Sequence, residues 1–196
     1  MSRSFGRLAL VGICLLAAPL RDAPSPGQTA GEPDRRPDVI YWPTPPEVVA
    51  KMLELADLKP DDVLYDLGCG DGRIVIEAAK RYGVRSVGYD IDPKRVAQSL
   101  ENVRKAGVSH LVTIRKQDIF QVDLSRASVV TMYLLPELNV RLKPQLARLR
   151  PGSRVVSHAF DMRGAKPHQT VKVRSPKGEE RTVHLWVVPW EEENPR

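Results

Sequence analysis

The chain has 196 residues, of which 42% are hydrophobic and 28% charged, and its formal net charge is +6. This length suits one domain, and the balance is that of an ordinary soluble globular protein. Ten lysines and arginines face only two acidic residues between Glu137 and Lys177. Such a segment either attracts nucleic acid, anionic lipid or an acidic protein, or it forms solvated surface; without interleaved aromatic residues to stack bases, the second reading is favoured.

The first 38 residues differ from the rest of the chain. Residues 1–7 are short and basic, residues 8–20 are an apolar run, and residues 21–38 are rich in proline, glycine and charge. This order resembles a secretory signal peptide and a linker, and the apolar run is shorter than the roughly 20 residues of a membrane span. We expect an exported or membrane-tethered protein whose folded domain is residues 39–196. A start codon assigned too early is the alternative, and the protein is then cytoplasmic.

Strand and helix patterns alternate from Val39 onward. Helices are expected where apolar residues recur at helical spacing, and strands where short apolar runs lie between turn residues. The expected helices are Pro45–Leu58, Arg73–Tyr82, Pro93–Ala106 and Pro136–Leu149. The expected strands are Val63–Leu67, Ser86–Ile91, Leu111–Arg115, Ser128–Leu134, Arg154–Phe160, Thr170–Arg174 and Thr182–Val188. This alternation predicts an α/β fold: a doubly wound, mostly parallel, seven-stranded sheet with a C-terminal antiparallel hairpin.

A glycine loop follows the first expected strand. Glycine at positions 68, 70 and 72 lets the chain turn sharply and lets a ligand press against the main chain. Gly68, Gly70 and Gly72 alone would also suit a dinucleotide, but Asp66 and Asp71 would repel its diphosphate. S-adenosylmethionine has no phosphate and carries an ammonium and a sulfonium group. The acidic loop therefore favours S-adenosylmethionine as the ligand.

Further acidic residues follow the next two strands. Asp90 stands about 20 residues beyond the loop, where a carboxylate accepts hydrogen bonds from both ribose hydroxyls, and Ile91 can pack on the adenine. Asp92 is expected to cap the next helix. Asp118 either accepts a hydrogen bond from the adenine amino group or is a turn residue.

No metal site is expected. The four histidines are isolated in sequence, and neither cysteine has a Cys or His partner at ligand spacing.

Two motifs carry a resemblance to a known class. Asp66–Arg73 and Gly88–Pro93 resemble motif I and the following acidic motif of class I, Rossmann-like, S-adenosylmethionine-dependent methyltransferases. Tyr41–Pro45 and Asp71–Ile76 are similar to a narrower group of small protein lysine methyltransferases. That group includes archaeal broad-specificity enzymes and mitochondrial enzymes acting on ATP synthase subunit c and on the adenine nucleotide translocase. The resemblance covers residues 39 to about 160.

The resemblance implies a function and two further site residues. It implies S-adenosylmethionine as methyl donor, a lysine side chain of a protein as acceptor, and a donor pocket lined by Tyr41 and Thr44. The residues themselves leave open that Trp42 and its neighbouring prolines only anchor a stiff segment. They also leave open a small-molecule N-, O- or S-methyltransferase, or a donor-binding regulatory protein without catalysis. Oligomeric state is not predicted.

The acceptor site is expected after the fourth strand, at the carboxyl edge of the sheet. The sequence there runs Met132 to Asn139 and lacks the Asn/Asp-Pro-Pro-Tyr motif of enzymes that methylate nucleic-acid bases, which counts against a nucleic-acid substrate. Tyr133 is the candidate for shaping the acceptor channel, with core packing as the alternative. His158 and Asp161, after the next strand, either assist deprotonation of the acceptor or make structural hydrogen bonds.

Overall fold

The computed structural model describes residues 36–176 and 178–193. The predicted signal-like segment lies outside these residues except for its last three, and it stays a prediction. Within the described residues, no helix is both long and apolar enough to cross a membrane.

The described residues form four α-helices, one short 3-10 helix and seven strands. The helices are α1 (Pro46–Leu55), α2 (Arg73–Tyr82), α3 (Pro93–Lys105), the 3-10 helix η1 (Ile119–Gln121) and α4 (Pro136–Leu146). The strands are β1 (Val63–Leu67), β2 (Arg85–Asp90), β3 (Val112–Lys116), β4 (Val129–Met132), β5 (Arg154–His158), β6 (Gln169–Arg174) and β7 (Glu180–Val187).

The strands form one sheet in the order β3-β2-β1-β4-β5-β7-β6. Strands β1 to β5 are parallel, and β7 is antiparallel to both β5 and β6. The predicted fold class is therefore confirmed. The chain moves outward from β1 through β2 to β3 and then returns to the other side of β1 with β4. Ligands of open α/β sheets bind at such a reversal, outside the carboxyl ends of the strands.

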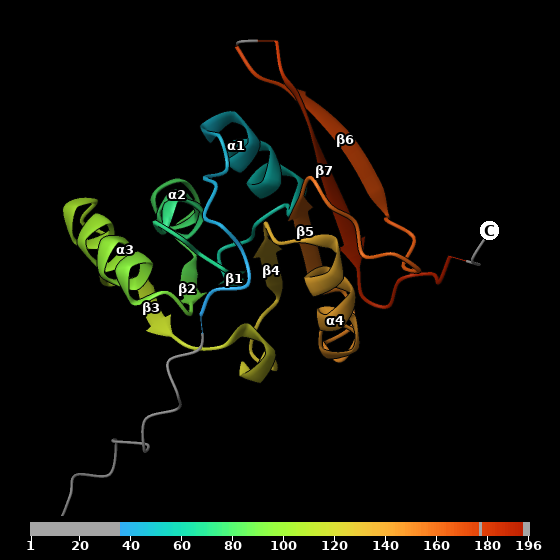
Figure 1. Ribbon diagram of the computed structural model, residues 1–196, viewed down its shortest axis with the longest axis horizontal. Coiled ribbons are helices and arrows are strands. Elements are labelled where there is room, and N and C mark those ends of the chain that lie inside the picture. Colours follow the sequence, from blue (N-terminus) through green and yellow to red (C-terminus); the bar gives the residue numbers. More distant parts are fainter. Residues whose placement is uncertain (1–35, 177, 194–196) are drawn as a thin grey trace, which may run out of the picture. The chain divides into compact units, whose positions relative to one another are not determined.

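Two hydrophobic cores lie on opposite faces of the sheet, and Figure 1 shows α1, α2 and α3 on one side and α4 on the other. Neighbouring strand residues alternate between the cores, as the pleat requires. In β4, Val129 belongs to the core beneath the first three helices and Val130 to the core beneath α4. In β5, Val156 and Val155 divide in the same way. Both strands are thus buried on both faces, which is why they read as continuous apolar runs.

Four elements end two or three residues earlier than the sequence predicts. The helix expected to reach Leu58 ends at Leu55, because the chain turns through Asp57 with φ of 46°. The strand expected to reach Phe160 ends at His158, because Ala159 has φ of 66°. Helix α4, expected to reach Leu149, ends at Leu146.

At the end of α4 the backbone tightens. Arg148 and Leu149 donate to carbonyls three residues back, so a tight turn replaces the last predicted helical turn after Leu146. The strand expected to reach Leu134 ends at Met132, which leaves Tyr133 in the connection to α4.

A buried polar cluster fastens the amino ends of the three central strands. Asp62, just before β1, accepts hydrogen bonds from the Ser128 hydroxyl at 2.6 Å and from the Lys59 amide at 2.7 Å. The Arg154 guanidinium, at the start of β5, forms an ion pair with the same carboxylate. Every oxygen of Asp62 thus has a partner, which a buried charge requires.

Replacing Asp62 with alanine is expected to destabilise the fold by about 3 kcal/mol, because it leaves the Arg154 charge and the Ser128 hydroxyl without their buried partner. Urea denaturation measures this change. Glu101→Gln is the control, since Glu101 pairs with Arg104 on the exposed surface, and no measurable loss is expected there. Equal stability of the Asp62 variant and the parent would contradict the structural role of the cluster.

Candidate active site

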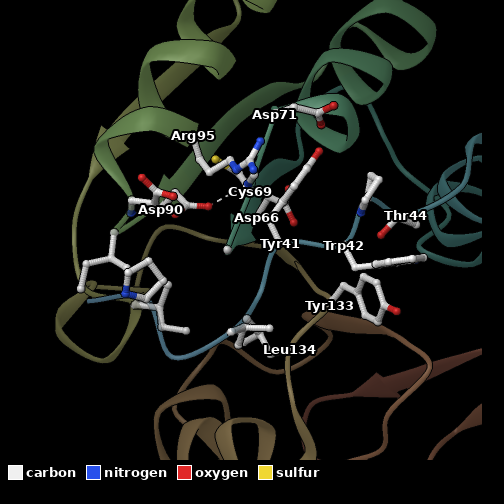
Figure 2. Close-up of a pocket in the computed structure, with 18 of the residues that line it drawn as sticks. Tyr41, Trp42, Thr44, Asp66, Cys69, Asp71, Asp90, Arg95, Tyr133 and Leu134 are labelled. Atoms are coloured by element: carbon white, nitrogen blue, oxygen red, sulfur yellow. Dashed lines mark hydrogen bonds between the residues drawn. The ribbon is translucent and has the colours of Figure 1, made fainter. Parts of the chain in front are cut away.

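A pocket opens at the carboxyl edge of the sheet, where β1, β2 and β4 end. Residues 37–44, which we call the strap, lie over it, and Figure 2 shows Tyr41 and Trp42 of the strap beside Asp66, Asp90 and Tyr133. The sequence-predicted residues that line the pocket are Tyr41, Thr44, Asp66, Gly68, Gly70, Asp90, Ile91, Asp118 and Tyr133. Gly72, His158 and Asp161 do not line it. The chemical roles assigned from the sequence stay predictions.

The first two glycines of the loop are required by both conformation and space. Gly68 and Gly70 have φ of 83° and 56°, in the left-handed region that side chains disfavour. A Cβ at Gly70 would lie 2.4 Å from Cε2 of Tyr41, and one at Gly68 would lie 2.9 Å from Cδ2 of Leu134. The pocket is therefore lined by bare main chain, with a strap ring pressed against it.

The third glycine serves a different purpose. Gly72 precedes α2, and a Cβ there would lie 2.3 Å from Oγ of Ser99 on α3. The absent side chain lets α2 and α3 approach each other. The structure thus gives Gly72 a packing role rather than a place in the pocket wall.

Asp90 fixes the glycine loop from the neighbouring strand. Its Oδ2 accepts a hydrogen bond from the Gly70 amide at 2.8 Å (dashed in Figure 2), and its Oδ1 accepts one from the Asp92 amide at 2.9 Å. Each carboxylate oxygen can accept a second bond, so two acceptor positions remain. Burial raises the pKa of Asp90 above its ordinary value. Asp92 caps α3 through the Lys94 amide, as predicted.

Asp118 is a turn residue that also faces the pocket. Its Oδ1 accepts a hydrogen bond from the Phe120 amide at 3.0 Å and caps η1, and the same residue lines the pocket. The turn role is established, and contact with an adenine amino group stays a prediction.

Asp66 is the most deeply buried carboxylate in the pocket. It is 2% exposed at the end of β1 and accepts a hydrogen bond from the Thr131 hydroxyl at 2.7 Å. Burial raises the pKa of Asp66 to about 7, and the charges of Asp90 and Asp71 add to the rise, while the Thr131 bond opposes it. A cation entering the pocket would favour the ionised form.

The strap is held in place at Thr44. The Arg73 guanidinium donates to the Thr44 carbonyl at 2.7 Å and is itself paired with Asp71 at 2.6 Å. The Thr44 hydroxyl lies 3.3 Å from Nδ1 of His158. Groups from α2 and β5 therefore meet on one strap residue.

Two arginines offset part of the negative charge of the carboxyl groups in the pocket. Arg95 stacks over the Tyr41 ring at 3.8 Å, and Arg73 pairs with Asp71. The charged lining residues are Asp38, Asp66, Asp71, Asp90, Asp92 and Asp118 against Arg73 and Arg95. Six carboxyls minus two guanidiniums give a formal charge of −4 with every group ionised. The pocket is acidic, although the chain carries a net charge of +6.

Tyr133 packs against two rings, that of His158 at the end of β5 and that of Phe160 in the turn that follows. Its ring centroid lies 3.9 Å from that of His158 and 6.4 Å from that of Phe160. His158 is 1% exposed, and burial lowers its pKa to about 4, so the imidazole is neutral near pH 7. It supports Tyr133 from behind and has no direct access to the pocket. Asp161 is exposed.

Asn139 on α4 supports the site, although the sequence analysis does not single it out. It is fully buried, and its Nδ2 donates to the carbonyls of Phe160 and Asp161, both at 3.1 Å. These bonds hold the turn that follows His158 and carries Phe160. The signal was its helical spacing to Leu142 and Leu146, which marks the buried face of α4.

Comparison with known proteins identifies the chain. The sequence profile of the ANTKMT methyltransferase domain matches residues 66–169, more than half of the 196 residues. The chain belongs to this family. A protein-lysine N-methyltransferase from Saccharolobus islandicus is 48% identical over 154 residues, which are 78% of this chain and 95% of that protein.

More distant and structural relatives agree on methyl transfer. The adenine nucleotide translocase lysine N-methyltransferase of Mus musculus is 35% identical over 116 residues, which are 58% of this chain and 50% of that one. An RNA methyltransferase from Salinibacter ruber, solved in complex with S-adenosyl-L-homocysteine, is 50% identical with a TM-score of 0.70, covering 79% of this chain and 97% of that chain. This ANTKMT-family chain is therefore an S-adenosylmethionine-dependent methyltransferase, as predicted.

The pocket fits this donor on its own geometry. At Gly68 and Gly70 the wall of the pocket is main chain that carries no side chain. Asp90 retains acceptor positions for hydroxyl groups, and Asp66 offers a buried carboxylate to an ammonium. The donor, when bound, supplies a methyl group on a positively charged sulfur.

Gly70→Ala is expected to weaken binding of S-adenosylhomocysteine at least tenfold, because the new methyl group occupies the space of the Tyr41 ring and the residue must keep a positive φ. Isothermal calorimetry measures the Kd. Gly107→Ala is the control, because its φ is also positive but no heavy atom lies within 4 Å of a Cβ there. A loss of equal size in both variants would show that strain alone is responsible.

Binding of S-adenosylhomocysteine is expected to tighten about fivefold between pH 6 and pH 7. The pKa of Asp66 is about 7, so its ionised fraction rises over this interval, and the ligand's ammonium prefers the carboxylate. The ligand's α-amino group titrates near pH 8 and stays charged throughout. Calorimetry across the interval tests this, with Asp66→Asn expected to bind more weakly and without the pH dependence. A parent enzyme with a flat profile would contradict the proposed contact.

Proposed function

We propose that this methyltransferase transfers the methyl group to lysine side chains of proteins. The acidic pocket carries the proposal, because its formal charge of −4 attracts a cationic acceptor and the chain's own positive charge lies elsewhere. The lysine nitrogen forms a bond to the methyl carbon as the carbon–sulfur bond breaks, and the lysine proton passes to solvent.

The names of the two most fully covered relatives disagree about the acceptor. The Saccharolobus islandicus protein is a protein-lysine N-methyltransferase, and the Salinibacter ruber protein is called an RNA methyltransferase. The pocket favours the first, since phosphate groups approaching it would meet carboxylates. In the basic stretch 137–177, four of the ten lysines and arginines form ion pairs with glutamates among the described residues. These pairs are Lys143–Glu192, Arg163–Glu137, Lys166–Glu191 and Lys172–Glu180.

Tyr133 supports the acceptor's approach in this proposal. It lines the pocket at the end of β4 and is held by His158 and Phe160, so its ring presents a fixed wall. An aromatic face attracts a lysine ammonium and packs on its methylene chain. Partial burial against that wall disfavours the charged amine and helps it to lose its proton.

The location we propose rests on the sequence pattern of residues 1–38, a basic start followed by an apolar run. We propose that residues 1–38 tether the enzyme to a membrane with the catalytic domain facing the cytoplasm, where the donor is made. Fractionation of cells that express the full chain tests this. Enzyme released from membranes by salt alone would contradict a tether inserted in the lipid.

The function is tested by incubating the full chain with methyl-labelled donor and cell extract. Label is expected in protein and is expected to survive base treatment, because N-methyl-lysine is stable where methyl esters hydrolyse. Label confined to RNA would contradict the proposal. Label confined to small molecules would favour a small-molecule methyltransferase, and donor binding without transfer would favour a regulatory protein.

Tyr133→Ala is expected to lower kcat/KM for a lysine peptide by about 10- to 100-fold and to change donor Kd by less than twofold, because the variant removes the acceptor wall. Tyr133→Phe is the matched control, since it keeps the ring that packs on His158, and it is expected to retain most activity. Equal losses of donor affinity and turnover in Tyr133→Ala would instead assign the residue to the donor site.

A further inference from the structure

The strap presents two apolar side chains to solvent beside the pocket. Ile40 is 89% exposed and Trp42 is 66% exposed, the highest values for large hydrophobic residues in the described part of the chain. Tyr41 between them turns inward, with its ring against Gly70. This alternation is that of an extended segment, which sends successive side chains to opposite faces. Ile40 and Trp42 therefore share the outward face, and we call them the strap ridge.

The position of the strap ridge is fixed by the fold. Two residues beyond Trp42, the Thr44 carbonyl accepts a hydrogen bond from Arg73 and its hydroxyl contacts His158. Tyr41 is covered by the Arg95 guanidinium. The exposed ridge is thus held by neighbours that are themselves anchored in α2, α3 and β5.

Both ridge residues also line the pocket. Figure 2 draws Trp42 at the same end of the pocket as Tyr133, the proposed acceptor wall. A chain segment that delivers a lysine to Tyr133 consequently passes over exposed apolar surface. Two exposed apolar side chains at the rim of the pocket offer surface that a bound chain segment can cover.

We propose that the strap ridge binds the acceptor protein itself, by contacting an apolar side chain two positions from the acceptor lysine in an extended segment. The inference rests on the proposed function and adds the substrate class. In an extended segment, residues two apart point to the same side and lie about 6.6 Å from each other. When the lysine enters the pocket, these neighbours face the rim.

Charge distinguishes this occupant from a lipid surface. The pocket next to the strap ridge has a formal charge of −4, so anionic headgroups are repelled where a lysine is attracted. A segment that combines a lysine with a nearby apolar residue satisfies the pocket and the ridge together.

The test uses the full chain and three peptides with one lysine each. One has leucine two positions before and after the lysine, the second has serine there, and the third has leucine at the adjacent positions instead. The parent enzyme is expected to favour the first peptide over the other two by about tenfold in kcat/KM. Trp42→Ala is expected to reduce this preference to twofold or less, and Trp42→Phe is expected to restore most of it.

Leu100→Ser is the matched control, because Leu100 is 49% exposed on α3 and does not line the pocket. It is expected to keep the parent's preference. Equal methylation of the three peptides by the parent, or an unchanged preference in Trp42→Ala, would overturn the inference and leave lysine methylation intact. Loss of donor affinity in Trp42→Ala would place the indole in the donor site and also overturn it. Label on none of the lysine peptides would overturn the proposed function, and this inference with it.

Discussion

The main chain after β1 has to turn back within a few residues while leaving its surface open to a ligand. It does so with positive φ at Gly68 and Gly70, in a space so narrow that a single methyl group on Gly70 would meet the Tyr41 ring. Asp90 secures this turn through the Gly70 amide. The position of the strap depends on the same turn, because Tyr41 packs on the glycine and Arg95 packs on Tyr41. Donor site and strap are therefore built as one unit.

A second constraint is the concentration of carboxyl groups in one pocket. Burial and mutual repulsion both oppose ionisation of these carboxyl groups. Local partners stabilise the carboxylates: Arg73 pairs with Asp71, Thr131 donates to Asp66, and backbone amides donate to Asp90. Burial leaves Asp66 with a pKa of about 7. A positive charge on the ligand would therefore favour the ionised form of Asp66. The same carboxyl groups would attract the cationic acceptor that we propose.

The sequence was sufficient for the fold and for nine of the residues that line the pocket. Period-two and period-3.6 patterns give the strands and helices, and the glycine loop with Asp66 and Asp90 is local in sequence, so its geometry can be predicted without knowing the rest. Boundaries failed where backbone conformation decided them, as at Asp57 and Ala159, since neither residue signals a positive φ.

The support for Tyr133 could not be predicted in the same way. It depends on contacts between residues far apart in the chain: Asn139 reaches the turn at Phe160, and His158 reaches both Tyr133 and Thr44. Such contacts follow only from the placement of β4 beside β5. His158 looked like a candidate base in the sequence, and only its burial shows that it packs behind the pocket.

Ala159, in the turn after β5, has a backbone conformation that non-glycine residues rarely adopt. A non-glycine residue at φ of 66° is strained by about 1–2 kcal/mol, yet the turn keeps it, held by Asn139 and by a hydrogen bond from the Ala159 amide to the Thr182 carbonyl. A glycine there would relieve the strain. It would also let the turn sample other conformations and weaken the packing of His158 and Phe160 against Tyr133. The strain is retained at Ala159 because the surrounding structure fixes its conformation, in a turn beside the pocket.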